Sequence, residues 1–232
     1  MQNGKNITVI SLGGSLIVPR HIDWKFLKKF RELIEKEIKK GEKFILITGG
    51  GYAAREYQQA ACKVAELTAE DRDWLGIHAT RMNAHLVRTI FRKHAHPVVN
   101  KNPHDLEDFD NFKESIMVAA GWRPGRSTDY AAVVIGKYFE AKRVINLSNI
   151  DYVCDKDPRK FSDAKKIKKI SWTDFRKIVG NKWDPGMNAP FDPVASKIAQ
   201  EAGLEVVIMN GKNIKNLKSY LDGGKFKGTV IK

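Results

Sequence analysis

Short apolar segments alternate with longer amphipathic segments along all 232 residues, and this alternation constrains the fold more than any other feature. The apolar segments have the length and the Val and Ile content of buried strands, and apolar residues recur at helical spacing in the segments between them. This order predicts a mainly parallel sheet with helices on both faces. We therefore expect an α/β protein, a three-layer α/β/α sandwich formed by a single domain of residues 1–232.

The pattern also places the individual elements. The segments that predict strands are residues 7–12, 43–48, 97–99, 115–119, 143–147, 205–209 and 228–231, the last as a closing edge strand. The segments that predict helices are 23–40, the stretch from the glycines at 49–51 to 66, 70–94, the stretch that begins at 130, 171–180, 192–202 and 214–221. Asp23, Ser171 and Asp192 are the expected N-caps, and Gly41 ends the first long helix. Segment 105–113 fits neither pattern.

Positive charge dominates the composition. The formal net charge is +14, from 41 Lys and Arg against 27 Asp and Glu, and such a balance favours anionic partners such as nucleotides, nucleic acids or acidic membranes. Solubility is the simpler explanation, since much of the excess lies on helix faces and in the run 165–169. No basic-aromatic module is visible, so we do not expect nucleic-acid binding as the main function.

The sequence gives no sign of a membrane protein or of a metal site. No apolar run is long enough to span a bilayer and the N-terminus has no signal-peptide pattern, so we expect a cytoplasmic protein with no membrane partner. Cys62 and Cys154 lie far apart in the sequence, and the six histidines show no ligand spacing. We assign no metal ligand among the side chains.

Four loops that directly follow predicted strands carry Gly, Ser, Thr or Asp. In a parallel sheet these loops leave the same edge, which is where ligands bind. Unpaired backbone N–H groups and the dipole at a helix start favour anions there. We therefore expect the four loops to gather and to hold two phosphate-bearing ligands end to end. The loops are Gly13-Gly14-Ser15, Gly49-Gly50-Gly51, residues 121–129 and residues 148–151.

The loop 121–129 is the most informative of the four. It lies between a predicted strand and a predicted helix, and it contains two arginines, two hydroxyl side chains and one carboxylate. This combination indicates phosphate chemistry rather than a plain connection. Its sequence is Gly121-Trp122-Arg123-Pro124-Gly125-Arg126-Ser127-Thr128-Asp129.

The glycine loops are weaker signals when taken singly. Gly13-Gly14-Ser15 lets a phosphate approach the backbone, but it also fits a structural turn, and it lacks the pattern of a Walker loop or of a dinucleotide fold. Gly49-Gly50-Gly51 carries a large chain-entropy cost, which close approach to a ligand or to a neighbouring loop would justify. Arg55, one helical turn on, can point back at an anion or lie on the surface.

Three further segments allow two readings each. Asp73 shares a helix face with Gly76 and Thr80 and can accept sugar hydroxyls, or it is an ordinary charge near a helix start. Residues 148–158 are polar enough for a nucleoside pocket, and they are equally typical of turns. Asp192 is a candidate site residue or only an N-cap followed by Pro at the first helical position.

Taken in order, these motifs resemble the amino-acid kinase superfamily and, within it, the hexameric UMP kinases of bacteria and archaea. The resemblance runs from Ile7 to Ile231. Each motif is modest alone, and the ordered set is specific. The set is Gly-Gly-Ser, Gly-Gly-Gly-x-x-x-Arg, Asp-x-x-Gly-x-x-x-Thr-x-x-Asn, Pro-Gly-x-Ser/Thr-Thr-Asp and Asn-x-Asp-x-Val-x-x-x-Asp-Pro.

The resemblance implies a kinase that uses ATP and Mg²⁺ to phosphorylate UMP to UDP in pyrimidine biosynthesis. It implies an amino-acid kinase-like fold, an acceptor-binding part of about residues 1–140, an ATP-binding part of about 141–232, and a homohexamer. The ATP-binding residues implied are Ser11, Gly13, Gly14, Ser15, Gly51, Arg55, Ser148, Asn149, Cys154 and Asp157. The UMP-binding residues implied are Gly50, Asp73, Gly121, Trp122, Arg123, Pro124, Gly125, Arg126, Ser127 and Thr128. The catalytic residues implied are Asp129, Asp192, Arg126 and Arg55.

The chain departs from the pattern at three places. Ser11 stands where many relatives have a Lys that contacts the transferred phosphoryl group, and Arg126 stands where they often have Phe or His, so Arg126 could supply the missing charge. Asp151-Tyr152-Val153-Cys154 replaces Asp-Gly-Val-Tyr/Phe, which bears on the adenine contacts.

Two alternatives therefore stay open. One is a kinase of the same superfamily for isopentenyl phosphate, carbamate or an amino acid, and the other is a non-catalytic nucleotide-binding or storage protein.

Overall fold

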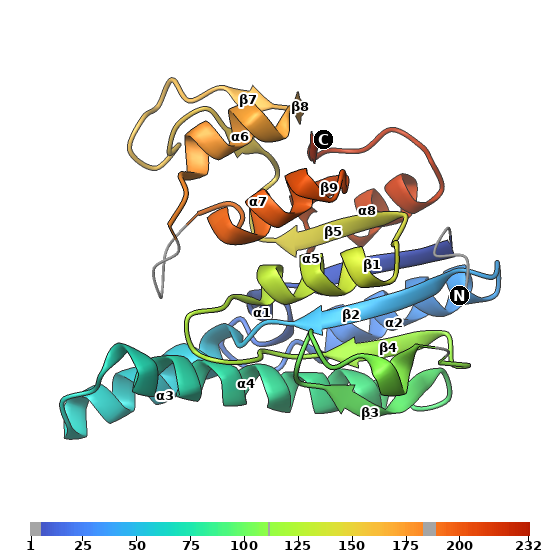
Figure 1. The fold of residues 1–232 in the computed structure, drawn as a ribbon, viewed down its shortest axis with the longest axis horizontal. Helices are drawn as coiled ribbons and strands as arrows, with labels where there is room; N and C mark the ends of the chain where they lie inside the picture. The colour runs from blue at the N-terminus through green and yellow to red at the C-terminus, as the bar shows by residue number, and fades with distance from the viewer. Residues whose placement is uncertain (1–5, 111, 183–188) are drawn as a thin grey trace.

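An eight-stranded sheet forms the centre of the molecule (Figure 1). The computed structural model describes residues 6–110, 112–182 and 189–232. The strand order is β3-β4-β2-β1-β5-β9-β10-β8, and the pairs from β3 to β9 are all parallel. The strands of this sheet are β1 (Ile7–Leu12), β2 (Lys43–Thr48), β3 (Ala95–Asn100), β4 (Ile116–Ala119), β5 (Arg143–Ser148), β8 (Lys169–Ile170), β9 (Val206–Asn210) and β10 (Thr229–Ile231). A separate antiparallel pair consists of β6 (Val153–Cys154) and β7 (Lys166–Ile167).

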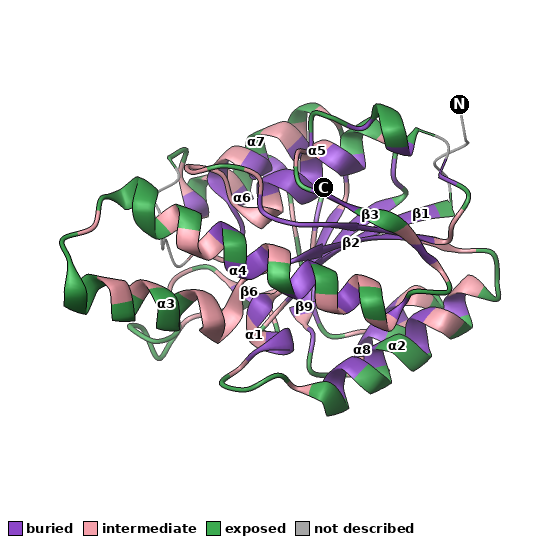
Figure 2. Cartoon of the chain, turned by 90° about the horizontal axis from the view of Figure 1, so that it is seen from below, coloured by how far each residue is buried: buried purple, intermediate pink, exposed green. Residues whose placement is uncertain are grey.

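Helices cover both faces of the sheet, which confirms the predicted three-layer sandwich. The helices are α1 (Gly14–Ile17), α2 (Trp24–Ile38), α3 (Gly51–Val64), α4 (Ala69–Ile90), α5 (Thr128–Tyr138), α6 (Trp172–Val179), α7 (Pro193–Glu201) and α8 (Ile214–Leu221). Buried residues of α5, α6 and α7 pack on one face, and those of α1, α2, α4 and α8 pack on the other. Figure 2 shows the buried strands between the two helical layers. None of the helices in the described part of the chain combines the length and apolarity of a membrane span.

The alternation of side chains along β1 explains why the strand is apolar throughout. Ile7 and Val9 point into the core under α5, whereas Ile10 and Leu12 point into the core over α2. Because both faces are covered, the strand needs apolar side chains on both sides. Ser11 continues the row of Ile7 and Val9, so its hydroxyl faces the layer that holds α5.

Most local predictions are confirmed, with corrections at some ends. Asp23 accepts a hydrogen bond from Phe26 N at 2.9 Å as the N-cap of α2. The predicted helix 70–94 ends at Ile90, and β3 starts at Ala95, before the expected 97–99. Segment 105–113 holds a short 3₁₀ helix, Glu107–Phe109, and Asn111 lies outside the described residues.

The expectation that 228–231 forms an edge strand is wrong. Strand β10 lies inside the sheet, antiparallel to β9 and parallel to β8. Its outer partner is the two-residue strand β8, which lies in the lysine-rich run that showed no strand pattern. The edge is therefore formed by β8, whose exposed Lys169 suits an edge position.

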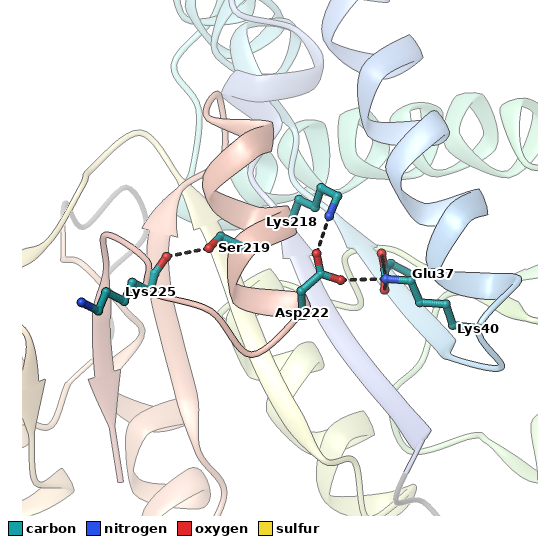
Figure 3. A network of polar contacts seen from close by, with 6 residues as sticks. All are labelled: Glu37, Lys40, Lys218, Ser219, Asp222 and Lys225. Atoms are coloured by element: carbon teal, nitrogen blue, oxygen red, sulfur yellow. Dashed lines mark hydrogen bonds and ion pairs between the residues drawn. The ribbon is translucent and has the colours of Figure 1, made fainter.

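A polar network joins α2 to α8 at the amino-terminal edge of the sheet (Figure 3). Lys40 Nζ lies 2.7 Å from Asp222 Oδ1 and 2.9 Å from Glu37 Oε1, and Lys218 also donates to Asp222. These hydrogen bonds lower the pKa of Asp222 to about 2. Since both helices run back from the carboxyl ends of their strands, the network lies at the opposite edge from the four predicted ligand loops.

Candidate active site

The first two glycine loops touch through their backbones. A Cβ atom on Gly14 would lie 2.0 Å from the Gly51 nitrogen, and one on Gly51 would lie 2.3 Å from the Gly14 oxygen. Gly51 also has a φ of +67°, which favours glycine. The glycine run therefore does allow close approach to a neighbouring loop, and its approach to a ligand stays a prediction. The starts of α1 and α3 lie side by side as a result.

Helix α4 holds the second and third loops in place. Asn83 Nδ2 donates to the Gly49 carbonyl at 2.7 Å, and the Thr80 hydroxyl accepts from Gly121 N at 2.7 Å. Arg81 donates to the Trp122 carbonyl at 2.9 Å. Thr80 and Asn83 are both buried, so their side chains lie away from water. One helix therefore fixes the backbone of both loops relative to each other.

Asp73 contacts the predicted acceptor loop directly. Its Oδ2 atom accepts a hydrogen bond from Gly125 N at 2.8 Å, and Gly125 has a φ of +75°. Asp73 lies in the second turn of α4, which begins at Ala69, so it is more than a charge at a helix start. The predicted contact of Asp73 with ribose hydroxyls stays a prediction, and it would involve a carboxylate that is already positioned.

Asp129 lies where β1, β5 and α7 meet the start of α5. Its Oδ1 atom accepts from Ser11 Oγ at 3.0 Å and from Asn146 Nδ2 at 2.8 Å. Burial, followed by the nearby carboxylate of Asp192, raises the pKa of Asp129 to about 7. The hydrogen bonds from the Ser11 hydroxyl and the Asp192 backbone act in the opposite direction. The predicted catalytic carboxylates Asp129 and Asp192 therefore lie together.

Asp192 connects the starts of α5 and α7. As the N-cap of α7 it accepts from Val194 N at 2.6 Å and Ala195 N at 3.1 Å, which agrees with the predicted cap. Its other oxygen accepts a hydrogen bond from the Ser127 hydroxyl, and Ser127 is itself the N-cap of α5. Asp192 is therefore both an N-cap and a neighbour of the loop 121–129, so the two readings of this residue are compatible.

Aromatic rings surround the two arginines of the loop. The Arg126 guanidinium lies 5.0 Å from the centre of the Tyr130 ring and donates to the Gly125 carbonyl at 3.1 Å. The Trp122 ring stacks on Tyr130, and Arg123 lies 4.1 Å from the Trp122 ring centre. None of these contacts joins Arg126 to Ser11. That Arg126 supplies the charge missing at position 11 therefore stays a prediction.

A cavity of about 680 Å³ adjoins the end of β5. Its volume lies in the range of small-molecule sites. Ile150, Val153, Ile178 and Val179 contribute apolar surface, and Tyr152 lies in the wall as well. Four of the residues that the resemblance implies for ATP binding line it, namely Ser148, Asn149, Cys154 and Asp157.

The cavity connects to the glycine loops through the end of β5. Gly13 N donates to the Leu147 carbonyl at 2.9 Å, and a Cβ on Gly13 would lie 3.7 Å from Ser148 Cα. Asp157 at the far wall accepts from the Arg159 guanidinium at 2.8 Å, which lowers the pKa of Asp157 to about 2. The four predicted loops thus form one continuous series at the carboxyl edge of the sheet.

Comparison with known proteins identifies the family. A sequence profile described as the amino acid kinase family matches residues 6–210. The chain belongs to the amino acid kinase family. The uridylate kinase of Methanococcus aeolicus is 32% identical to this chain over 227 residues, covering 96% of this chain and 98% of the relative. The resemblance to UMP kinases that the motifs indicated is thereby confirmed.

Solved structures agree with this assignment. The uridylate kinase of Archaeoglobus fulgidus superimposes with a TM-score of 0.82 at 28% identity, over 97% of this chain and 99% of that one. The UMP kinase of Ureaplasma parvum gives a TM-score of 0.75 at 19% identity, over 98% of each chain, and supports the fold. The amino-acid kinase fold expected from the loop motifs is therefore present.

The sequence analysis does not identify several polar residues that position the site. Asn146 carried a signal, because an amide inside an apolar strand needs a partner. No local sequence pattern marked His104 or Arg81, because their partners are distant in the sequence. The Nε2 atom of His104 lies 3.1 Å from the Tyr130 hydroxyl, and Arg81 donates to the Trp122 carbonyl. Of the predicted residues, Arg55 lies exposed on α3 with its guanidinium 6.0 Å from the Tyr52 ring.

Proposed function

We propose that this chain is a uridylate kinase that transfers the terminal phosphoryl group of ATP to UMP. The proposal rests on one observation above the others. The contact between Gly14 and Gly51 lies between a nucleoside-sized cavity on one side and the arginine-bearing loop 121–129 on the other. Two nucleotides bound end to end would bring their phosphates together over this contact. The names of the relatives, which span nearly the whole chain, support the same activity.

On the donor side, we propose that the adenosine of ATP occupies the cavity and contacts Ser148, Asn149, Cys154 and Asp157. Its phosphates would follow the backbone of the first two glycine loops, where N–H groups at helix starts favour anions. The proposed phosphate-binding residues are Gly13, Gly14, Ser15, Gly51 and Arg55. Ser11 is buried and donates to Asp129, so we propose that it affects the donor through that carboxylate.

Mg²⁺ is proposed to arrive with the ATP phosphates and to neutralise their charge. Within the described residues, no group of three or more His, Cys, Asp or Glu side chains is placed to hold a metal. The ligands we propose are phosphate oxygens, with Asp129 and Asp192 orienting the groups around them. This agrees with a site whose protein part is mostly backbone N–H groups and arginines.

On the acceptor side, we propose that UMP binds to Gly50, Asp73 and the loop 121–128. Its phosphate is the nucleophile and is ionised at neutral pH, so no general base is required. The protein then has to align the two nucleotides and to neutralise charge on the transferred group. Arg55 and Arg126 would supply positive charge, together with the backbone N–H groups.

Several wider properties accompany the proposal. The acceptor would bind mainly to residues 1–140 and ATP mainly to residues 141–232, although one sheet runs through both parts. We also propose a homohexamer, a role in pyrimidine nucleotide synthesis and residence in the cytoplasm. Light scattering of the purified protein would test the hexamer.

A coupled assay with ATP, Mg²⁺ and a panel of acceptors tests the function. The panel contains UMP, CMP, AMP, GMP, isopentenyl phosphate, carbamate and free amino acids. We expect UMP to give the highest kcat/KM. Turnover of another acceptor without turnover of UMP would contradict the substrate, and binding of ATP and UMP without product in a single-turnover experiment would contradict catalysis.

A further inference from the structure

We propose that Asn146 is a positioning residue of the phosphoryl transfer, and that it holds the Asp129 carboxylate jointly with Ser11. The proposal rests on the function proposed above. Asn146 would act through Asp129 and would touch neither nucleotide.

The sheet register brings the two donors together. Ser11 on β1 and Asn146 on β5 are direct partners in the parallel pairing, so their side chains leave the same face of the sheet at the same level. Both side chains donate to one atom, Asp129 Oδ1, at 3.0 and 2.8 Å. Asp129 is thus held by two neighbouring strands at once, as well as by the backbone of Asp192.

Packing alone does not explain an amide at this position. Asn146 is 6% exposed and has Ile145 and Leu147 as neighbours in a strand that is otherwise buried and largely apolar. A β-branched apolar residue would suit such a strand better. A buried amide weakens the fold unless it is hydrogen-bonded, and the bond found here goes to Asp129.

Asp129 needs hydrogen-bond donors because of its neighbour. Asp192, the N-cap of α7, lies close to it, and its carboxylate disfavours a second negative charge. The groups that face Asp129 from β1 and β5, Ser11 and Asn146, are uncharged. Each stabilises the ionised carboxylate, and each can partly replace the other. Removal of both should let Asp129 take up a proton or leave its position.

The experiment compares Asn146→Val, Ser11→Ala and the double variant with wild type. We expect each single change to lower kcat by about tenfold and to leave the KM values for ATP and UMP within about twofold, as for loss of one hydrogen bond to a charged group. The kcat of the double variant should fall by a larger factor than the product of the two single decreases, because each donor can partly replace the other. The acidic limb of the kcat profile should move to higher pH in Asn146→Val.

Thr8→Val is the matched control, because it also removes a buried polar group from a central strand, here β1. Thr8 accepts from Arg143 at the other end of the strand, so its loss should lower stability by the same amount at every pH. The loss of stability in Asn146→Val should instead grow from pH 5 to pH 8, as Asp129 ionises. A kcat profile and a stability loss in Asn146→Val that match those of Thr8→Val would overturn the proposal. If wild type does not phosphorylate UMP, the proposed function fails, and the stability comparison still decides whether Asn146 holds Asp129.

Discussion

The Asp73 carboxylate accepts a hydrogen bond from the backbone N–H of Gly125 at 2.8 Å, although 52 residues separate them in the sequence. This contact attaches helix α4 to the loop that we propose binds UMP. It gives Asp73 two possible tasks, which are to contact the ribose and to hold the loop. Both tasks concern the acceptor, and neither concerns ATP.

Asp73→Ala should therefore raise the KM for UMP by about tenfold or more and leave the KM for ATP within about twofold. Steady-state kinetics with one nucleotide varied at a time would measure this. Glu70→Gln, which changes an exposed carboxylate one turn earlier on α4, is the control and should change neither constant. An equal rise in both KM values would argue against an acceptor-side role.

Gly51→Ala should damage the fold more than an ordinary glycine substitution. The new methyl group would meet the Gly14 carbonyl at 2.3 Å in a backbone with positive φ, so we expect a loss above about 3 kcal/mol in the free energy of unfolding. Gly41 has a φ of +91°, but a Cβ atom there would meet nothing within 4 Å. Gly41→Ala should therefore lower the free energy of unfolding by only about 1 kcal/mol. Urea denaturation of both variants would separate backbone strain from the clash.

Asp129→Asn should increase stability at pH 8 while lowering activity. The pKa of Asp129 is raised from its ordinary 3.8 to about 7, so the folded state binds more protons than the unfolded chain between these values. Stability contributed by this group consequently falls as the pH rises from about 4 to 7. The uncharged amide of Asp129→Asn should raise the free energy of unfolding by roughly 1 to 3 kcal/mol at pH 8.

Urea denaturation at pH 5 and pH 8 would check this prediction. The gain from Asp129→Asn should be larger at pH 8 than at pH 5, and kcat should be lower than in wild type at both. A stability gain that does not depend on pH would mean that Asp129 is not the titrating group.

Arg126→Ala should lower kcat by more than about tenfold if its guanidinium offsets charge on the transferred phosphoryl group. Arg126→Lys keeps the charge but not the planar group over Tyr130, and should recover part of the rate. Steady-state rates with saturating ATP and UMP would show this. An unchanged rate in Arg126→Ala would mean that the charge missing at position 11 is not supplied from here.

Cys154 offers a chemical test of the donor site. It lines the cavity and is half-buried, whereas Cys62 is exposed on α3. In a Cys62→Ser protein, saturating ATP should slow the reaction of Cys154 with a thiol reagent by about tenfold, because the nucleotide would cover it. UMP alone should have little effect. Protection by UMP and not by ATP would reverse the proposed order of the two nucleotides along the sheet edge.

The order of strands and helices could be predicted because it depends on local signals. Buried strands such as Ile7–Leu12 are continuous apolar runs, and N-caps such as Asp23 and Asp192 act within three residues. The place of β10 could not be predicted, since it depends on pairing with a two-residue strand in a lysine-rich run.

The candidate site shows the same division. Its loops could be found because glycine and hydroxyl residues follow strands directly in the sequence. The side chains that fix those loops, such as Thr80 under Gly121 and His104 against Tyr130, act across long sequence separations. Only the buried amide of Asn146 left a local trace, as a polar residue in an apolar strand.

The direct backbone contact between Gly14 and Gly51 has a consequence for motion during turnover. Since not even one methyl group fits between them, we expect the turns after β1 and β2 to move together. We then expect any closing of the protein around its ligands to come from the segments on either side, which are the arginine-bearing loop before α5 and the β6–β7 pair. The reacting phosphates would then rest on a part of the enzyme that keeps its shape while its surroundings open and shut.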